Sequence, residues 1–213
     1  MKEQVGVVLG LLLGALNVAR CSAGQAPASP QGAGPLQPAR IVVGTVLTSV
    51  SGPPIRIRVR PNFRYAGGQR FILREVADAE QHCFVETSSQ NAVSRAYWIQ
   101  FEQFLPGRSG KYAYESDQPM NLAGLSMRVH VRRFTEPPAA DSDRQRAYDL
   151  LAKAGFVVPS PATRVRLVHL PEADGRQELM IIYLEPAETT AELTPEEGRA
   201  IIQRATEGLS ISR

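Results

Sequence analysis

The chain has 213 residues, of which 43% are hydrophobic and 21% are charged, and its formal net charge is +3. The length suits one domain, and the composition is that of a globular protein rather than of a disordered or fibrous one. The charge is too small for a dedicated nucleic-acid-binding protein, which normally concentrates basic residues in a patch. Nucleic acid is therefore not expected as a partner.

The first 23 residues have the layout of a secretory signal peptide. A lysine supplies a positive start, residues 5–16 form an apolar run too short to span a bilayer well, and small residues continue to Ala23. We expect cleavage near Ala23 and export to the periplasm or the extracellular space. The alternative is a membrane-anchored lipoprotein lipidated at Cys21, although Arg20 stands where a lipobox has a small residue.

A linker and one folded domain follow the signal peptide. Residues 24–40 consist mainly of Gly, Pro, Ala and Gln, and this composition predicts a flexible linker. Residues 41–213 are expected to form a single globular domain. Cleavage would leave Cys83 as the only cysteine, so we expect a small buried side chain there, no disulfide, and a fold that depends on its core.

Segments with strand-like alternation fill most of this domain. The stretch from 92 to 105 contains the only tryptophan of the chain and predicts the central strand of an antiparallel sheet. A long loop is predicted over 106–124, where Gly, Pro, Ser and Asp are frequent. The predicted strands are 41–48, 55–60, 69–76, 81–87, 92–105, 126–134, 163–170 and 177–185.

The two faces of the central strand differ, because side chains alternate with a period of two. Tyr97 and Ile99 share an apolar face, which we expect to pack against the helices. Trp98, Gln100 and Glu102 share the other face, where Trp98 is expected to be only partly buried. A Trp beside Gln and Glu can line a ligand pocket. The alternative is a partly covered sheet face with its polar groups at the solvent edge.

Two helices are predicted in the C-terminal half. The first begins after Ser142 and ends before Gly155, and the second begins after Thr194, forms a capping box with Glu197 and ends at Gly208. Together with the strands, they indicate an α+β fold with a curved antiparallel sheet of about seven to nine strands.

The last two strands predict a hairpin with Asp174 and Gly175 as its two-residue turn. In that register Arg166 faces Tyr183, and Arg164 faces Glu185. Both arginines would then have suitable cross-strand partners, an aromatic ring and a carboxylate.

Basic side chains occupy every second position of three predicted strands. If the strand of Arg58 lies beside the strand of His130 and Arg132, one sheet face is cationic and can bind a phosphate or a carboxylate. The alternative is a solvated outer face whose arginines pair with nearby glutamates.

Motifs of catalysis and cofactor binding are absent from the sequence. There is no metal-ligand spacing, no GxSxG or CxxC, and the segment GRSGK at 107–111 lacks the glycine and the hydroxyl residue of a phosphate-binding loop. We therefore predict no cofactor, no metal and no catalytic residue. An enzyme alternative remains, a hydrolase or lyase that pairs His130 or His82 with Glu102 or Glu86.

The favoured interpretation is a non-catalytic, extracytoplasmic binding or interaction module for a small molecule or a protein. A membrane would be a partner only if Cys21 carries a lipid. The candidate binding residues are Trp98, Gln100, Glu102, Arg58, His130 and Arg132.

Four segments resemble parts of exported bacterial proteins of unknown function: FRYAGGQRFIL, VADAEQHCFVE, AYWIQFEQFLP and ELMIIYLE. The resemblance covers most of residues 60–185. It implies one bacterial domain type and transfers no activity, ligand or catalytic residue.

Overall fold

The computed structural model describes residues 36–88 and 91–213. The predicted signal peptide and residues 24–35 of the predicted linker lie outside the described residues. Neither described helix has the length and the apolar content needed to cross a bilayer.

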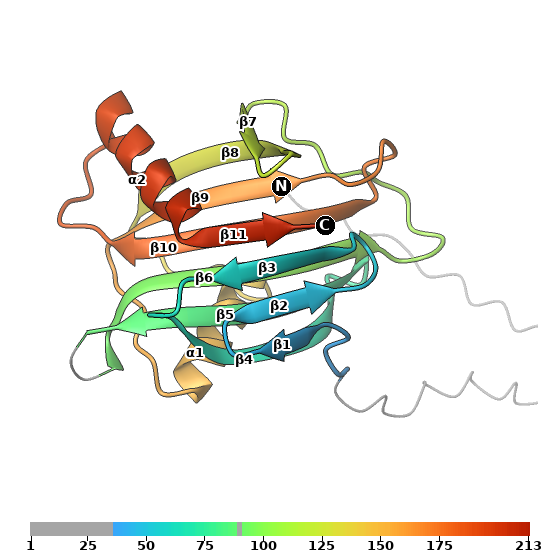
Figure 1. Cartoon of the computed structure of the whole chain (residues 1–213), viewed down its shortest axis with the longest axis horizontal. Coiled ribbons are helices and arrows are strands. Elements are labelled where there is room, and N and C mark those ends of the chain that lie inside the picture. The colour runs from blue at the N-terminus through green and yellow to red at the C-terminus, as the bar shows by residue number, and fades with distance from the viewer. Residues whose placement is uncertain (1–35, 89–90) are drawn as a thin grey trace, which may run out of the picture. The chain divides into compact units, whose positions relative to one another are not determined.

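Eleven strands in the described residues form two antiparallel sheets (Figure 1). The four-stranded sheet has the order β1–β2–β3–β11, and the seven-stranded sheet has the order β4–β5–β6–β10–β9–β8–β7. The strands of the first sheet are β1 Ile41–Val43, β2 Val46–Ser49, β3 Ile55–Val59 and β11 Leu209–Ser212. Those of the second are β4 Arg64–Leu73, β5 Ala77–Thr87, β6 Val93–Phe104, β7 Gln118–Leu122, β8 Leu125–Phe134, β9 Ala162–His169 and β10 Gln177–Pro186. The helices are α1 Asp143–Lys153 and α2 Pro195–Glu207.

One face of the seven-stranded sheet, here called the Tyr97 face, packs against the four-stranded sheet and α2 (Figure 1). Ile57 and Val59 from β3 meet Tyr97 and Tyr183 in this core, and all four side chains are buried. The Tyr97 hydroxyl donates a hydrogen bond of 2.7 Å to the carbonyl oxygen of Ala205 in α2. The alternating pattern of β3 therefore buries one row of side chains between the two sheets.

The opposite face, here called the Trp98 face, packs against α1. Trp98, Cys83 and Ile182 form a second core with Ala147 and Leu151 from that helix. Cys83 is fully buried as expected, and burial raises the pKa of its thiol to about 12. The seven-stranded sheet is thus covered on both faces.

The prediction of an α+β fold with antiparallel strands and two helices is confirmed, and the predicted sheet of seven to nine strands matches in part: one sheet has seven strands, and a second sheet of four was not expected. The expectation that Trp98 is only partly buried is wrong. Trp98 is 2% exposed and Tyr97 is fully buried, because α1 covers one side of β6 and the second sheet covers the other.

Both helices begin where their capping residues predict. The Ser142 side chain accepts a hydrogen bond from the backbone N–H of Gln145, and Thr194 and Glu197 form the complete capping box of α2. The chain turns at Gly155, where φ is +83°, and at Gly208. Gly208 has no room for a side chain, because a β-carbon there would lie 2.0 Å from the Tyr97 hydroxyl oxygen.

The strand predicted over 41–48 is divided into β1 and β2, because Gly44 turns the chain at a φ of +59°. Two strands were not predicted. β7 lies within the expected loop, and β11 follows directly after α2 and pairs with β3.

The predicted register of the hairpin between β9 and β10 is wrong by one residue. Leu179 pairs with His169, so Arg166 lies opposite Ile182 rather than opposite Tyr183. The connection spans residues 170–176 instead of two residues, and the ladder stops at His169 because Pro171 has no N–H to donate. This shift moves both arginines of β9 onto the Trp98 face.

Candidate functional site

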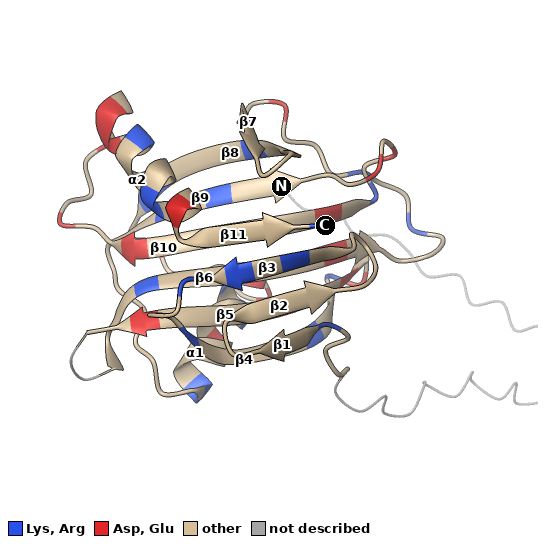
Figure 2. Cartoon of the chain, in the orientation of Figure 1, with Lys and Arg blue, Asp and Glu red and all other residues tan. Residues whose placement is uncertain are grey.

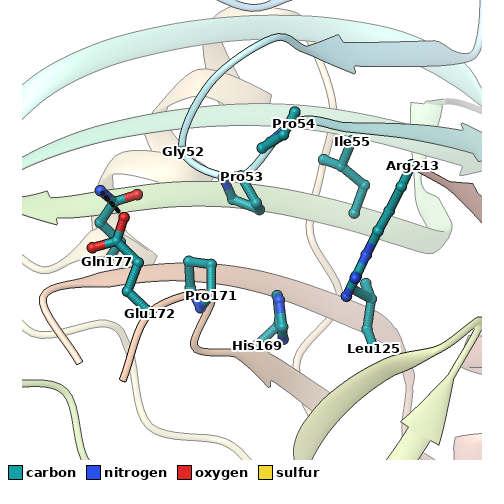
Figure 3. Close-up of a pocket in the computed structure, with 10 residues that line it drawn as sticks. All are labelled: Gly52, Pro53, Pro54, Ile55, Leu125, His169, Pro171, Glu172, Gln177 and Arg213. Carbon is teal, nitrogen blue, oxygen red and sulfur yellow. Dashed lines mark hydrogen bonds between the residues drawn. The ribbon is translucent and has the colours of Figure 1, made fainter. Parts of the chain in front are cut away.

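The cavity drawn in Figure 3 lies where the loop after β2 approaches the ends of β8 and β9. Its volume is about 350 Å³, and three prolines supply much of its lining. His169 Nδ1 lies 3.0 Å from the carbonyl oxygen of Ser126, and Glu172 accepts a hydrogen bond of 3.2 Å from Gln177. Arg213 extends into the same space (Figure 3). The other charged or titratable side chains are engaged with the chain itself, so this cavity offers few groups for recognition.

A second cavity, here called the Glu178 pocket, lies on the Trp98 face and has a volume of about 260 Å³. Strands β6, β9 and β10, the loop between β6 and β7, and the start of α1 all contribute to it. Leu73, Trp98, Met180 and Ile182 supply its apolar part. Its polar part consists of Glu102, Glu178, Tyr112, Tyr114, Arg74, Asp143, Arg164 and Arg166. Strongly perturbed titratable groups gather in this pocket, which makes it a better candidate for a functional site than the cavity of Figure 3.

A chain of hydrogen bonds positions Glu102 in this pocket. Trp98 Nε1 donates to Gln100 Oε1 at 3.0 Å, and Gln100 Nε2 donates to Glu102 Oε2 at 2.6 Å. Gln81 Nε2 also donates to Gln100 Oε1, at 2.7 Å. The second oxygen of Glu102 accepts a hydrogen bond of 2.7 Å from the Tyr112 hydroxyl. Burial nevertheless raises the pKa of Glu102, because these donors do not fully replace water.

Glu178 is the most perturbed carboxyl group of the pocket. It is 1% exposed, and its Oε2 accepts a hydrogen bond of 2.6 Å from the Tyr114 hydroxyl. Burial and the neighbouring charge of Glu102 raise its pKa to about 8. At neutral pH the Glu178 side chain is therefore mostly protonated and can donate a hydrogen bond.

Arg166 is held in place at the other end of the pocket. Its guanidinium forms an ion pair of 2.8 Å with Asp117 and lies 4.8 Å above the centre of the Tyr114 ring. Asp117 is 5% exposed, so this pair is partly shielded from solvent. Arg166 therefore supports the loop that carries Tyr114.

Arg164, two residues away on β9, lines the pocket without such a partner. No described residue forms an ion pair or a hydrogen bond with its guanidinium, and its Nε atom is buried and unsatisfied. Burial lowers its pKa to about 10, and the charges of Arg132, Arg166 and Arg144 add to the effect. A guanidinium in these surroundings is stabilised by any anion that reaches it.

The structure brings together three of the six predicted site residues. Trp98 and Glu102 line the Glu178 pocket, and Gln100 connects them. His130 and Arg132 lie on β8 opposite Arg166 and Arg164. His130 lines a separate cavity beside α2, where burial lowers its pKa. Arg132 forms an ion pair with Glu136.

Arg58 lies apart from the other candidates. It is exposed on β3 and belongs to the four-stranded sheet, whereas β8 and β9 belong to the seven-stranded sheet. Figure 2 shows the basic segments of β3 and β9 on these two different sheets. The predicted cationic face formed by Arg58 and His130 therefore does not assemble.

The histidine–carboxylate pairs expected for an enzyme do not assemble either. His82 Nε2 lies 2.8 Å from Glu80 Oε1 rather than near Glu102 or Glu86, and both partners are 1% exposed. Glu80 also accepts hydrogen bonds from the backbone N–H groups of Ala39 and Arg40. Through these hydrogen bonds, Glu80 holds Ala39 and Arg40 against the seven-stranded sheet. The His82–Glu80 pair therefore has a structural role.

Sequence reasoning missed Glu178, Arg164, Arg166 and the two tyrosines as one site. The arginines had been assigned to Tyr183 and Glu185 by the wrong hairpin register. The presence of Tyr112 and Tyr114 in an otherwise small and polar loop was the available signal, because tyrosine is frequent where a loop contacts a ligand.

In the part of the chain that the structure describes, no three His, Cys, Asp or Glu side chains come together in a way that could hold a metal ion. Searches against family models, curated proteins and solved structures find no match to this chain. The resemblance to exported bacterial proteins therefore stays a prediction, and the Glu178 pocket has to be interpreted from its own residues.

Proposed function

We propose that this protein is a non-catalytic, extracytoplasmic binding protein whose Glu178 pocket holds a small organic anion. The observation that carries the proposal is Arg164, a partly buried guanidinium that lines a cavity and forms no ion pair with any described residue, although the charge of Asp143 acts on it favourably. The positive charges of Arg132, Arg166 and Arg144 further disfavour a charged guanidinium that has no bound anion. A carboxylate or phosphate offers the oxygens that a guanidinium binds in a bidentate manner.

The apolar part of the pocket favours a ligand with a hydrocarbon portion. Trp98, Met180 and Ile182 line the cavity next to the charged groups. Each methylene group of a ligand that is buried against them contributes about 0.8 kcal/mol to the binding free energy. The volume of about 260 Å³ limits the ligand to a small molecule.

The test is isothermal titration calorimetry with hexanoate, hexyl phosphate and hexanol, which share a chain length and differ in their charged group. We expect at least one of the two anions to bind and hexanol not to bind detectably. Arg164→Met should weaken the anion by at least about tenfold, which corresponds to roughly 1.4 kcal/mol.

The matched control is Arg58→Met, because Arg58 is exposed on the other sheet. This variant should bind the anion as the wild type does. Equal binding of hexanol and the anions, or an Arg164→Met variant with full affinity, would contradict the proposal.

A second candidate is a hydrolase or lyase, and Glu178 is the observation that favours it. A carboxyl group with a pKa of about 8 beside a second carboxyl group is suited to acid–base chemistry at neutral pH. Proton NMR of a bound anion after long incubation separates the two candidates. An unchanged ligand supports the binding protein, and a product that Glu178→Gln fails to form supports the enzyme.

A further inference from the structure

The charges of the Glu178 pocket are segregated along its length. Glu102 and Glu178 are cross-strand partners at one end. Arg166 lies opposite Ile182, which is four residues from Glu178 on β10 and thus about 13 Å along the strand. Arg164 lies two residues farther along β9. The pocket therefore has an acidic end and a basic end.

The acidic end has no cation of its own. Within the described residues, no Lys, Arg or His forms an ion pair with Glu102 or Glu178, whose hydrogen-bond donors are Gln100 and two tyrosine hydroxyls. Glu178 is 1% exposed, and its Oε1 accepts no hydrogen bond from any described residue. A carboxyl oxygen that lines a cavity and accepts no hydrogen bond from the described chain is positioned to receive a donor from a ligand.

The other charged groups near this end do not supply the missing cation. Arg166 is paired with Asp117, and Arg74 lies in the turn after β4; their charges act on Glu178 and Glu102, but neither forms an ion pair with these carboxyl groups. Asp143, at the start of α1, adds a third negative group, whose charge acts on both carboxyl groups and also on Arg164. Tyr112 and Tyr114 have pKa values far above neutral, raised by burial and by the carboxylates, so both stay neutral.

We propose that the ligand of this pocket is dipolar, with an amine that binds between Glu102 and Glu178 and an anionic group that binds Arg164. This inference rests on the proposed function and extends it to the second end of the ligand. The amine of such a ligand places a positive charge at the acidic end, and its anionic group places a negative charge at the basic end. Neither end then keeps an unpaired charge. A linear amino acid whose amine and carboxylate are separated by several methylene groups has this pattern.

Binding of an ammonium group has a measurable consequence for protons. Glu178 is mostly protonated at pH 7 in the free protein, since its pKa is about 8. The ammonium group stabilises the carboxylate form, so the carboxyl proton passes to the buffer as the complex forms. A simple anion has the opposite effect and favours retention of that proton.

The experiment compares 4-aminobutyrate, 6-aminohexanoate and 8-aminooctanoate with the unsubstituted fatty acids of the same lengths, by calorimetry at pH 7. Each titration is made in phosphate and in Tris, whose different ionisation enthalpies report the number of protons exchanged. We expect one amino acid to bind at least about tenfold tighter than its fatty acid and to release a proton.

Glu178→Gln should remove both the preference for the amino acid and the proton release, while it keeps the affinity for the fatty acid. Glu172→Gln, a change of an exposed glutamate away from this pocket, is the matched control and should keep all three properties. Arg164→Met should weaken both classes of ligand.

The outcomes separate this inference from the proposed function. If fatty acids bind as tightly as the amino acids, or if no proton is released, the pocket binds anions and the dipolar ligand is wrong. If no member of either series binds, both proposals fail. Proton release is measured on the wild type, so the test does not depend on the folding of a variant.

Discussion

Glu102 on β6 and Glu178 on β10 lie directly opposite each other, and both are nearly removed from solvent. Like charges at opposed positions of neighbouring strands repel each other, and burial strengthens the repulsion. The pair is therefore most stable with a proton on one carboxyl group. This arrangement is a source of instability that a packed apolar pair would not have.

Glu178→Gln is expected to raise the free energy of unfolding at pH 8 and to change it little at pH 4. The pKa of Glu178 is about 8 in the folded protein, above its ordinary 4.5, so the folded state holds this proton more tightly than the unfolded chain. The resulting stability is complete below about pH 4.5 and is lost as the pH rises towards 8. Gln cannot ionise, so the variant does not lose this contribution to stability as the pH rises.

Urea denaturation of the wild type and the variant at pH 4, 6 and 8 measures the difference. Other groups, such as Glu80 and His130, titrate in both proteins, so their contributions cancel in the difference between the two free energies of unfolding. Parallel pH profiles would show that Glu178 does not carry the pH dependence.

Trp98→Ala and Tyr97→Ala are each expected to lower the free energy of unfolding by about 3–5 kcal/mol, the range for large aromatic side chains in a core. Both side chains are buried, one against α1 and the other against the second sheet and α2. Ile41→Ala should cost much less, because Ile41 is 62% exposed. A small effect of Trp98→Ala in urea denaturation would mean that α1 does not cover this face in solution.

Two glycines of the last helical segment make a matched pair. Gly208→Ala should destabilise the protein by roughly 2 kcal/mol or more, since the new β-carbon would overlap the Tyr97 hydroxyl and push α2 away from the sheet. Gly198→Ala should stabilise it by about 0.5–1 kcal/mol, because Gly198 lies inside α2 with open space around it. Thermal unfolding compares the two, and shifts of the same sign would contradict the packing of α2.

Arg164→Met should stabilise the ligand-free protein by roughly 1 kcal/mol, because it removes a guanidinium that has no partner and is crowded by like charges. Arg166→Met should destabilise it, since Arg166 holds Asp117 and packs over Tyr114. Urea denaturation without ligand measures both. A loss of stability in Arg164→Met would point to a structural role for this arginine instead of ligand binding.

Local features of the fold could be predicted from the sequence, and features that depend on distant parts of the chain could not. Ser142 and Thr194 cap their helices as expected, since capping needs only the next three residues. The second sheet was missed because β3 finds its partner β11 at the other end of the domain. The alternation of β3 indicated one buried side but not what buries it.

Of the candidate site, only the residues on β6 could be predicted from the sequence. Period-two alternation placed Trp98, Gln100 and Glu102 on one face of β6, as the structure has them. Glu178 was missed because only the pairing of β10 with β6 brings it opposite Glu102. Arg164 was missed because Pro171 lengthens the hairpin loop, which changes the face on which the arginine lies.

The pairing of β11 with β3 also has a consequence for how the chain reaches its folded state. Leu209 pairs with Val59, roughly 150 residues earlier in the chain. Contacts of such long sequence separation slow folding, because a large loop must close before they form. During synthesis the edge of β3 that pairs with β11 stays without its partner until residues 209–212 have left the ribosome. A nascent chain stalled before Leu209 should therefore be trapped by a chaperone or cut by a protease, whereas the released chain resists both.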